Sequence, residues 1–193
     1  MESKTLLLTI HGSHLYGLSH AKSDEDFYRV IDSIPEKNEH GHVKKRNGHQ
    51  SVENNLDDTV FDLKTFMIHA YDGVPQALEA MYSPVATIDV LGAYRAGFRV
   101  SVQSMSAKYI HAIEKFSQFS FKRRRHALRY ALNLQEAISN NGRFNPVLSE
   151  SDKLMITEMA MDKNYIQHLR KLSYFELNLN EAVIAEAIEL EKP

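Results

Sequence analysis

The chain has 193 residues, of which 43% are hydrophobic and 25% charged, which is typical of a soluble globular protein of one or two small domains. Its formal net charge of −2 excludes an overall field that would draw it to nucleic acid or to a membrane, so attraction to polyanions has to be local. It has no cysteine, which excludes disulfides, thiolate metal sites and a cysteine nucleophile, and no apolar run of membrane length, so we expect a cytoplasmic protein without a membrane partner.

Short strands and turns are predicted for the first part of the chain. Residues 6–10 form a continuous apolar run, which predicts a buried strand. Residues 13–18 predict a short helix, and residues 27–31 predict a second strand. The polar stretch over residues 35–55 predicts a mobile loop or a frayed hairpin. Residues 59–61 predict a short third strand.

Helices are predicted for the rest of the chain. Apolar residues at helical spacing predict a helix over residues 63–71, and Pro75 and Pro84 mark the start and the end of the next one. Further helices are expected around residues 110–119 and over residues 126–140, 149–172 and 180–191. We therefore expect an α+β fold, with a small mixed β-sheet and flanking helices in a domain of residues 1–100 and a helical region over residues 101–193.

A glycine turn followed by two aspartates carries the most specific chemistry. Gly12-Ser13 follows the first predicted strand, and Asp24 and Asp26 precede the second. Side chains at i and i+2 of an extended chain point to the same face, so both carboxylates are expected to aim at one spot. Such a pair suits a divalent cation and the phosphates it carries, with the N–H groups after Gly12 and the Ser13 hydroxyl as phosphate donors. The alternative is a solvated acidic turn.

The stretch GSHLYGLSHAKSDEDF resembles the DNA polymerase beta-like nucleotidyltransferase superfamily, whose signature is Gly-Ser after the first strand and Asp-x-Asp at the second. It looks closest to the branch of predicted nucleotidyltransferases associated with RNA ligases, written GS-x-x-YG followed by SD-x-D. In that version Tyr16, Gly17 and Ser23 join the expected nucleotide site. Weaker similarity extends to DDTVFDLKTF, PQALEAMYSP and KRRRHALRYALNLQEAISNNGRF. The resemblance implies the nucleotidyltransferase fold.

The same resemblance implies a third acidic residue on a neighbouring strand, which completes the metal site and helps to activate the attacking hydroxyl. Asp57 and Asp58 are the two main candidates. Their side chains face opposite ways on a strand, so only one of them can serve, and the spacing favours Asp57. The expected cofactor is Mg²⁺, with Mn²⁺ as the alternative, and its expected ligands are Asp24 and Asp26.

Lys122, Arg125, His126 and Arg129 form the strongest basic cluster, and their spacing of i, i+3, i+4 and i+7 places them on one face of a helix. The resemblance places a similar helix beside the active site, where it would hold a triphosphate or a nucleic-acid phosphate. The alternative is a solvated helix face.

These features predict a metal-dependent nucleotidyltransferase that transfers an NMP unit from an NTP to an acceptor hydroxyl and releases pyrophosphate. The association with RNA ligases favours an RNA or DNA end as the acceptor, by analogy alone. Three rival interpretations are a metal-dependent phosphohydrolase, a non-catalytic nucleotide-binding module and a nucleic-acid binder that uses the basic helix. The oligomeric state stays open.

Overall fold

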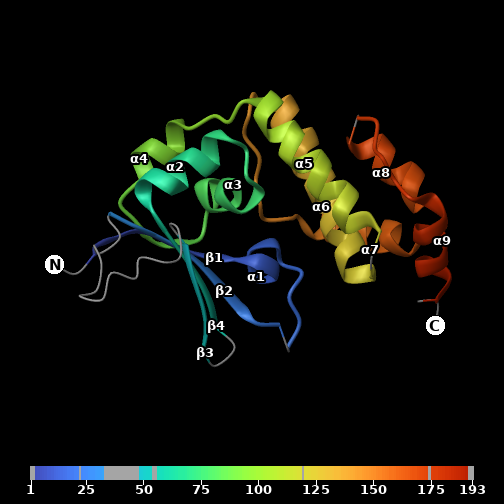
Figure 1. The fold of residues 1–193 in the computed structure, drawn as a ribbon, viewed down its shortest axis with the longest axis horizontal. Helices are drawn as coiled ribbons and strands as arrows, with labels where there is room; N and C mark the ends of the chain where they lie inside the picture. Colours follow the sequence, from blue (N-terminus) through green and yellow to red (C-terminus); the bar gives the residue numbers. More distant parts are fainter. Residues whose placement is uncertain are drawn as a thin grey trace, which may run out of the picture.

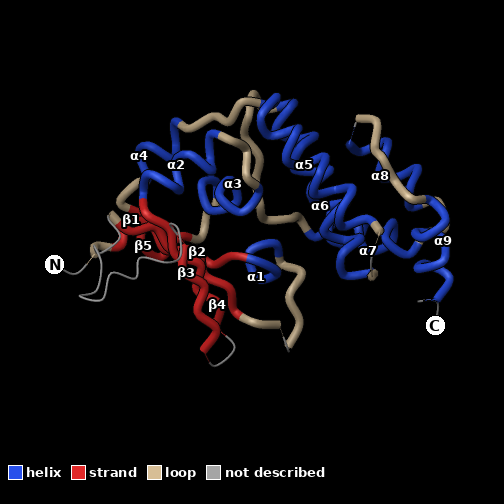
Figure 2. The backbone as a smooth tube through the Cα atoms, in the orientation of Figure 1, coloured by secondary structure: helices blue, strands red, loops and turns tan. Residues whose placement is uncertain are grey.

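The computed structural model describes residues 3–21, 23–32, 48–53, 56–118, 120–173 and 175–190. The strands of this part of the chain form one mixed sheet in the order β3-β4-β2-β1-β5. Their bounds are Thr5–His11 for β1, Glu25–Ile31 for β2, Gly48–Glu53 for β3, Leu56–Asp62 for β4 and Ala86–Asp89 for β5. All of these strands precede residue 100, and helices follow (Figure 2), which confirms the predicted α+β class.

Helices pack against the sheet and make up the second half of the chain. The first half contains α1 (Gly12–Tyr16), α2 (Leu63–Tyr71), α3 (Pro75–Tyr82) and α4 (Gly92–Gly97). The second half contains α5 (Val102–Ser117), α6 (Phe121–Ser139), α7 (Glu150–Met161), α8 (Tyr165–Ser173) and α9 (Glu181–Leu190). Figure 1 shows α2 and α3 against the sheet, α5 and α6 side by side, and α1 at the end of β1 toward the helical half.

One face of the sheet is covered by helices. β1 runs antiparallel to β2, and β2 runs parallel to β4. Leu7, Tyr28 and Val30 have at most 1% of their surface exposed, and they share the covered face because strand side chains alternate. These three side chains belong to one connected core of buried apolar side chains, whose first member along the chain is Leu7 and whose last is Ile188. The division into two domains at residue 100 stays a prediction.

Three features of the chain differ from the predicted elements. The helix expected over residues 149–172 is two helices, α7 and α8, because the backbone adopts an extended conformation at Asp162. The Oδ1 atom of Asp162 accepts the N–H of Asn164 at 2.8 Å. In the stretch expected as a loop or hairpin, β3 pairs antiparallel with β4, as in the hairpin alternative, but β4 begins at Leu56, before the expected residue 59; residues 33–47 lie outside the described residues. β5 and α4 were not predicted, and neither has the length or periodicity that marks an element locally.

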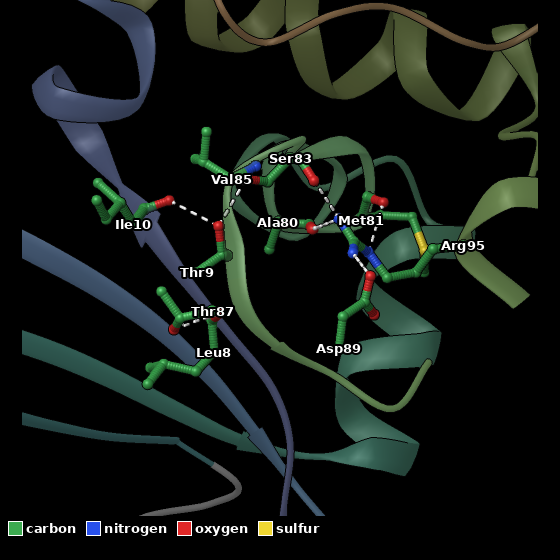
Figure 3. Close-up of polar contacts among 10 residues, drawn as sticks. All are labelled: Leu8, Thr9, Ile10, Ala80, Met81, Ser83, Val85, Thr87, Asp89 and Arg95. Atoms are coloured by element: carbon green, nitrogen blue, oxygen red, sulfur yellow. Dashed lines mark hydrogen bonds and ion pairs between the residues drawn. The ribbon is translucent and has the colours of Figure 1, made fainter. Parts of the chain in front are cut away.

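Arg95 of α4 connects β5 to the end of α3 through hydrogen bonds and an ion pair (Figure 3). Its guanidinium donates to the backbone carbonyls of Met81, Ala80 and Ser83 and forms an ion pair with Asp89 of β5. These carbonyls belong to the last turn of a helix, where they lack partners within the helix. The buried arginine therefore satisfies the end of α3 and holds the edge strand in place.

Among the residues that the structure describes, no helix combines the length and the apolar character needed to cross a lipid bilayer.

Candidate active site

Gly12 forms the turn between β1 and α1. Its φ of +63° lies in the left-handed region, which glycine adopts without the steric cost that a side chain brings. A Cβ at this position would overlap the Oδ2 atom of Asp26, so the carboxylate lies directly against the Gly12 backbone. The fold thus brings two parts of the motif, the glycine turn and the second aspartate, into contact.

Near one end of the neighbouring strands β1, β2 and β4, a histidine and two aspartates occupy adjacent positions. The register pairs His11 of β1 with Asp26 of β2, and Asp26 with Asp57 of β4. Position 57 is an even number of residues from Phe61, whose ring stacks on Tyr28 with the ring centres 5.4 Å apart. Because strand positions alternate between faces, position 57 lies beside Asp26 on the covered face.

Asp58 occupies the opposite face of the sheet. Its Oδ2 accepts from Nε of Arg29 at 3.0 Å and lies 3.0 Å from Nη2 of the same arginine. The exposed fractions of these two side chains are 35% for Arg29 and 25% for Asp58. Of the two candidates for the third acidic residue, only Asp57 is therefore at a position on the Asp26 face.

Ser23 and Asp24 lie in the segment that leads into β2. The Oγ of Ser23 accepts the backbone N–H of His20 at 2.9 Å, and the Ser23 N–H donates to the His20 carbonyl at 2.8 Å, which closes a turn. Asp24 is exposed and precedes the first residue of the strand, Glu25. Of the two expected metal ligands, Asp26 lies against the glycine turn, whereas Asp24 is an exposed residue directly before β2.

The remaining residues of the glycine motif shape α1. The carbonyl of Ser13 accepts the N–H of Leu18 at 2.9 Å, and Gly17 ends the helix with a φ of +74°. A Cβ on Gly17 would come within 2.5 Å of Nζ of Lys153, so the end of this side chain of α7 lies against the end of α1. Lys153 is a cationic neighbour of the motif that the sequence did not reveal, because it is distant along the chain.

A buried ionic cluster joins α1 to α3 and α6. The carboxylate of Glu79, which is 0% exposed, accepts from the hydroxyl of Tyr16 and from Nη1 of Arg129, the latter at 2.6 Å. Nδ1 of His11 lies 3.6 Å from the same carboxylate. The guanidinium carbon of Arg129 lies 3.5 Å from the centre of the Tyr16 ring, a cation–π contact that adds to the ion pair.

The cluster contains one strong charge pair and one neutral donor. Burial on its own lowers the pKa of Arg129, but the charge of Glu79, the smaller contributions of Tyr16 and Tyr130 and the hydrogen bond to Glu79 together outweigh that effect, and the net shift is upward. Burial is also the main cause of the raised pKa of Tyr16, so its hydroxyl stays protonated and donates. The solvated helix face considered as an alternative is therefore wrong at Arg129. Glu79 was missed because a glutamate in a short amphipathic helix is typical of a solvent-facing position.

The other basic residues of α6 line up beside this cluster. Lys122 is exposed, whereas Arg125 and His126 are half-buried, and the rings of His126 and Tyr16 have centres 6.0 Å apart. Burial, followed by the charges of Arg129, Lys122 and Arg125, lowers the pKa of His126 to about 3, so the imidazole is neutral near pH 7. Within the described part of the chain, Nε of Arg125 has no hydrogen-bond partner, and the guanidinium carbon lies 4.9 Å from the centre of the Phe121 ring. The surface next to α1 thus carries positive charge that a bound anion would neutralise.

A mixed sheet that holds Gly-Ser at the end of one strand against an aspartate of the next is the arrangement of a polymerase beta-like nucleotidyltransferase domain. The chain belongs to the RNA repair pathway DNA polymerase beta family (RlaP), whose model matches residues 1–187. Membership of this family points to chemistry of the nucleotidyltransferase type.

The chain is also similar to an uncharacterized 38.9 kDa protein in the nrdC-mobD intergenic region of Enterobacteria phage T4. The two are 35% identical over 88 residues, which make up 42% of this chain and 26% of the phage protein. The similarity therefore spans about a quarter of the length of the phage protein.

Proposed function

We propose that the protein is a metal-dependent nucleotidyltransferase that transfers an NMP unit from an NTP to an acceptor hydroxyl and releases pyrophosphate. The observation that carries this proposal is the contact of the Asp26 carboxylate with the backbone of Gly12. This contact supports a role of Asp26 as a ligand for a hard cation, because the carboxylate lies beside the backbone N–H groups of a glycine turn, which suit phosphate oxygens. Membership of the family supports the same class of reaction.

The proposed metal ligands are Asp24 and Asp26, and the proposed cation is Mg²⁺, with Mn²⁺ as the alternative. The donor set fits, because both cations prefer carboxylate oxygens and complete their coordination with phosphate and water. The described side chains, which do not include that of Asp57, contain no group of three or more potential metal ligands. We take Asp57 as the third carboxylate, because the register places its position beside Asp26. Such a cation neutralises the charge on the phosphate oxygens during transfer.

The residues of the chain take distinct roles in the proposed reaction. The N–H groups after Gly12 and the hydroxyl of Ser13 hold the triphosphate. Asp57 takes the proton of the acceptor hydroxyl, whose oxygen forms a bond to the α-phosphorus. The bond from the α-phosphorus to the oxygen that bridges to the β-phosphorus breaks, and pyrophosphate leaves with that electron pair.

The basic side chains of α6 are proposed to bind phosphate. Arg125 is the strongest candidate, because burial partly desolvates its guanidinium and its Nε has no hydrogen-bond partner among the described residues. Lys122 and the neutral ring of His126 lie on the same helix face as Arg125, and an approaching triphosphate would offset the repulsion between the positive charges of Lys122 and Arg125. Arg129 and Tyr16 contribute indirectly, since the Glu79 cluster occupies them and fixes α1.

The proposed acceptor is an RNA end. The description of the family names an RNA repair pathway, and the hydroxyl of a nucleic-acid end is a nucleophile of the required kind. The net charge of −2 means that the acceptor has to be held by local positive charge rather than by an overall field.

The test is transfer of label from α-³²P-labelled ATP, GTP, CTP and UTP, each with Mg²⁺, to RNA and DNA oligonucleotides. The wild-type chain should label an acceptor, and the double variant Asp24→Ala, Asp26→Ala should lose at least about a hundredfold in rate. Glu25→Gln is the matched control, because it removes an exposed carboxylate between the two ligands.

A second pair of variants separates the two candidates for the third carboxylate. Asp57→Asn should abolish transfer, whereas Asp58→Asn should keep it, because the Asp58 carboxylate is bound to Arg29 on the other face. Hydrolysis of NTP without labelling of any acceptor would replace the transferase by a phosphohydrolase. Binding of NTP without turnover would replace it by a nucleotide-binding module.

A further inference from the structure

A polar pocket of about 610 Å³ lies between the C-terminal half of α6, the segment 145–149 and the first turn of α7. Residues from all three segments line it, among them Leu132, Asn133, Glu136, Val147, Leu148 and Asp152. Its volume is within the usual range of small-molecule sites, about 300–1,000 Å³. No residue discussed above as a candidate for the glycine-turn site belongs to its lining.

The pocket adjoins α1 along two separate paths. Asn133 follows Arg129 by one turn of α6, a rise of about 6 Å, and Arg129 contacts the ring of Tyr16. Lys153 comes directly after a lining residue of α7, and its Nζ lies against Gly17. The pocket is therefore next to two parts of the chain that contact α1, the helix that begins at the glycine turn, and we take one ligand to extend from the turn to the pocket.

The described lining offers acceptors and apolar surface but no lysine or arginine. Glu136 is held in place, since its Oε2 accepts the N–H of Asn145 at 3.1 Å, and burial and the nearby Asp152 raise its pKa. Leu132 adds apolar surface on which a flat ring can pack.

We propose that this pocket binds the nucleobase of the NTP and favours bases with an exocyclic amine, namely adenine, guanine and cytosine, over uracil. The carboxylate of Glu136 accepts an amine N–H, whereas it repels the O4 carbonyl oxygen of uracil. The inference rests on the proposed function, because it takes the triphosphate to lie at the glycine turn.

Equilibrium titration of the full chain with ATP, UTP and inorganic tripolyphosphate, each with Mg²⁺, tests the pocket. The wild type should bind ATP about tenfold more tightly than UTP, which is the size expected for one hydrogen bond to a charged group. Glu136→Gln should reduce that preference to about twofold or less, because the amide also donates to a carbonyl oxygen. Tripolyphosphate affinity should stay the same in this variant.

A second variant blocks the pocket without disturbing another element. Ser139 is an exposed residue of the lining, and its hydroxyl bonds only within α6, to the carbonyl of Gln135 at 3.1 Å. Ser139→Trp should weaken ATP binding at least about tenfold by filling the pocket and leave tripolyphosphate binding unchanged. Glu158→Gln is the control, because it removes an exposed negative charge from α7 outside the pocket.

The outcomes separate the inference from the function on which it rests. If both pocket variants bind ATP and UTP as the wild type does while tripolyphosphate still competes with NTP, the nucleobase assignment is overturned and the nucleotide site stands. If NTP binds but tripolyphosphate does not compete with it, the link between pocket and glycine turn is overturned. If the wild type binds neither NTP nor tripolyphosphate, the proposed function itself fails.

Discussion

Removal of the Glu79 carboxylate should destabilise the protein strongly. Both members of the ion pair that Glu79 forms with Arg129 are fully buried, with 0% and 1% of their side-chain surfaces exposed. Glu79→Leu leaves the guanidinium without its partner and the Tyr16 hydroxyl without its acceptor. Breaking a buried pair from one side costs about 3–5 kcal/mol. For a domain of this size, that lowers Tm by about 6–20 °C.

A double-mutant cycle tests the origin of this loss. Arg129→Met should cost a similar amount, but the double variant Glu79→Leu, Arg129→Met should lose less than the sum of the two single variants, since no unpaired charge remains. The measurement is urea unfolding at pH 7, followed by circular dichroism. Glu181→Gln is the control: its pair with Arg170 is about half exposed, so its loss should stay below about 1 kcal/mol.

Two results would refute this reasoning. A loss below about 1 kcal/mol for Glu79→Leu would mean that the ion pair contributes no more than an exposed one. Additive losses in the double variant would mean that the two side chains act independently.

Three further predictions follow from the contacts described above. Gly12→Ala should weaken Mg²⁺-dependent NTP binding at least about tenfold in a titration. The added Cβ meets the Asp26 carboxylate, and the left-handed backbone adds about 1–2 kcal/mol of strain. Gly97→Ala is the control and should leave binding unchanged, because its Cβ meets no atom within 4 Å. His126→Gln should flatten the pH dependence of stability. The pKa of His126 is about 3 in the folded chain and about 6.5 in the unfolded chain, so the unfolded chain binds the proton first as the pH falls. In urea unfolding experiments, the free energy of unfolding of the wild type should therefore fall by up to about 1.4 kcal/mol per pH unit between pH 6 and pH 4. Arg95→Met should lower the free energy of unfolding by about 3 kcal/mol, because it leaves buried carbonyls at the end of α3 without donors; a loss below about 1 kcal/mol in urea unfolding would contradict this assignment.

Local patterns were sufficient to predict most of the regular elements. Strands β1 and β2 and helices α2, α3 and α9 begin and end within a few residues of the expected bounds, because apolar periodicity, prolines and glycines act over short stretches of chain. β5 was not predicted, because its four residues form a strand only by pairing with β1, which is distant from it in the sequence. The break between α7 and α8 was missed because an aspartate within a helical pattern is tolerated by sequence criteria.

The sequence by itself determined the glycine turn, the two aspartates of the motif and the α+β class, because each depends on residue types at close spacing. Tertiary structure decided which neighbours these residues have. It set Asp26 against Gly12, turned Asp58 toward Arg29, and buried Arg129 against Glu79 rather than leaving it on a solvated helix face. The physical reason is that the role of a charged side chain depends on its burial and on its partner, and both are supplied by segments that meet only when the chain folds.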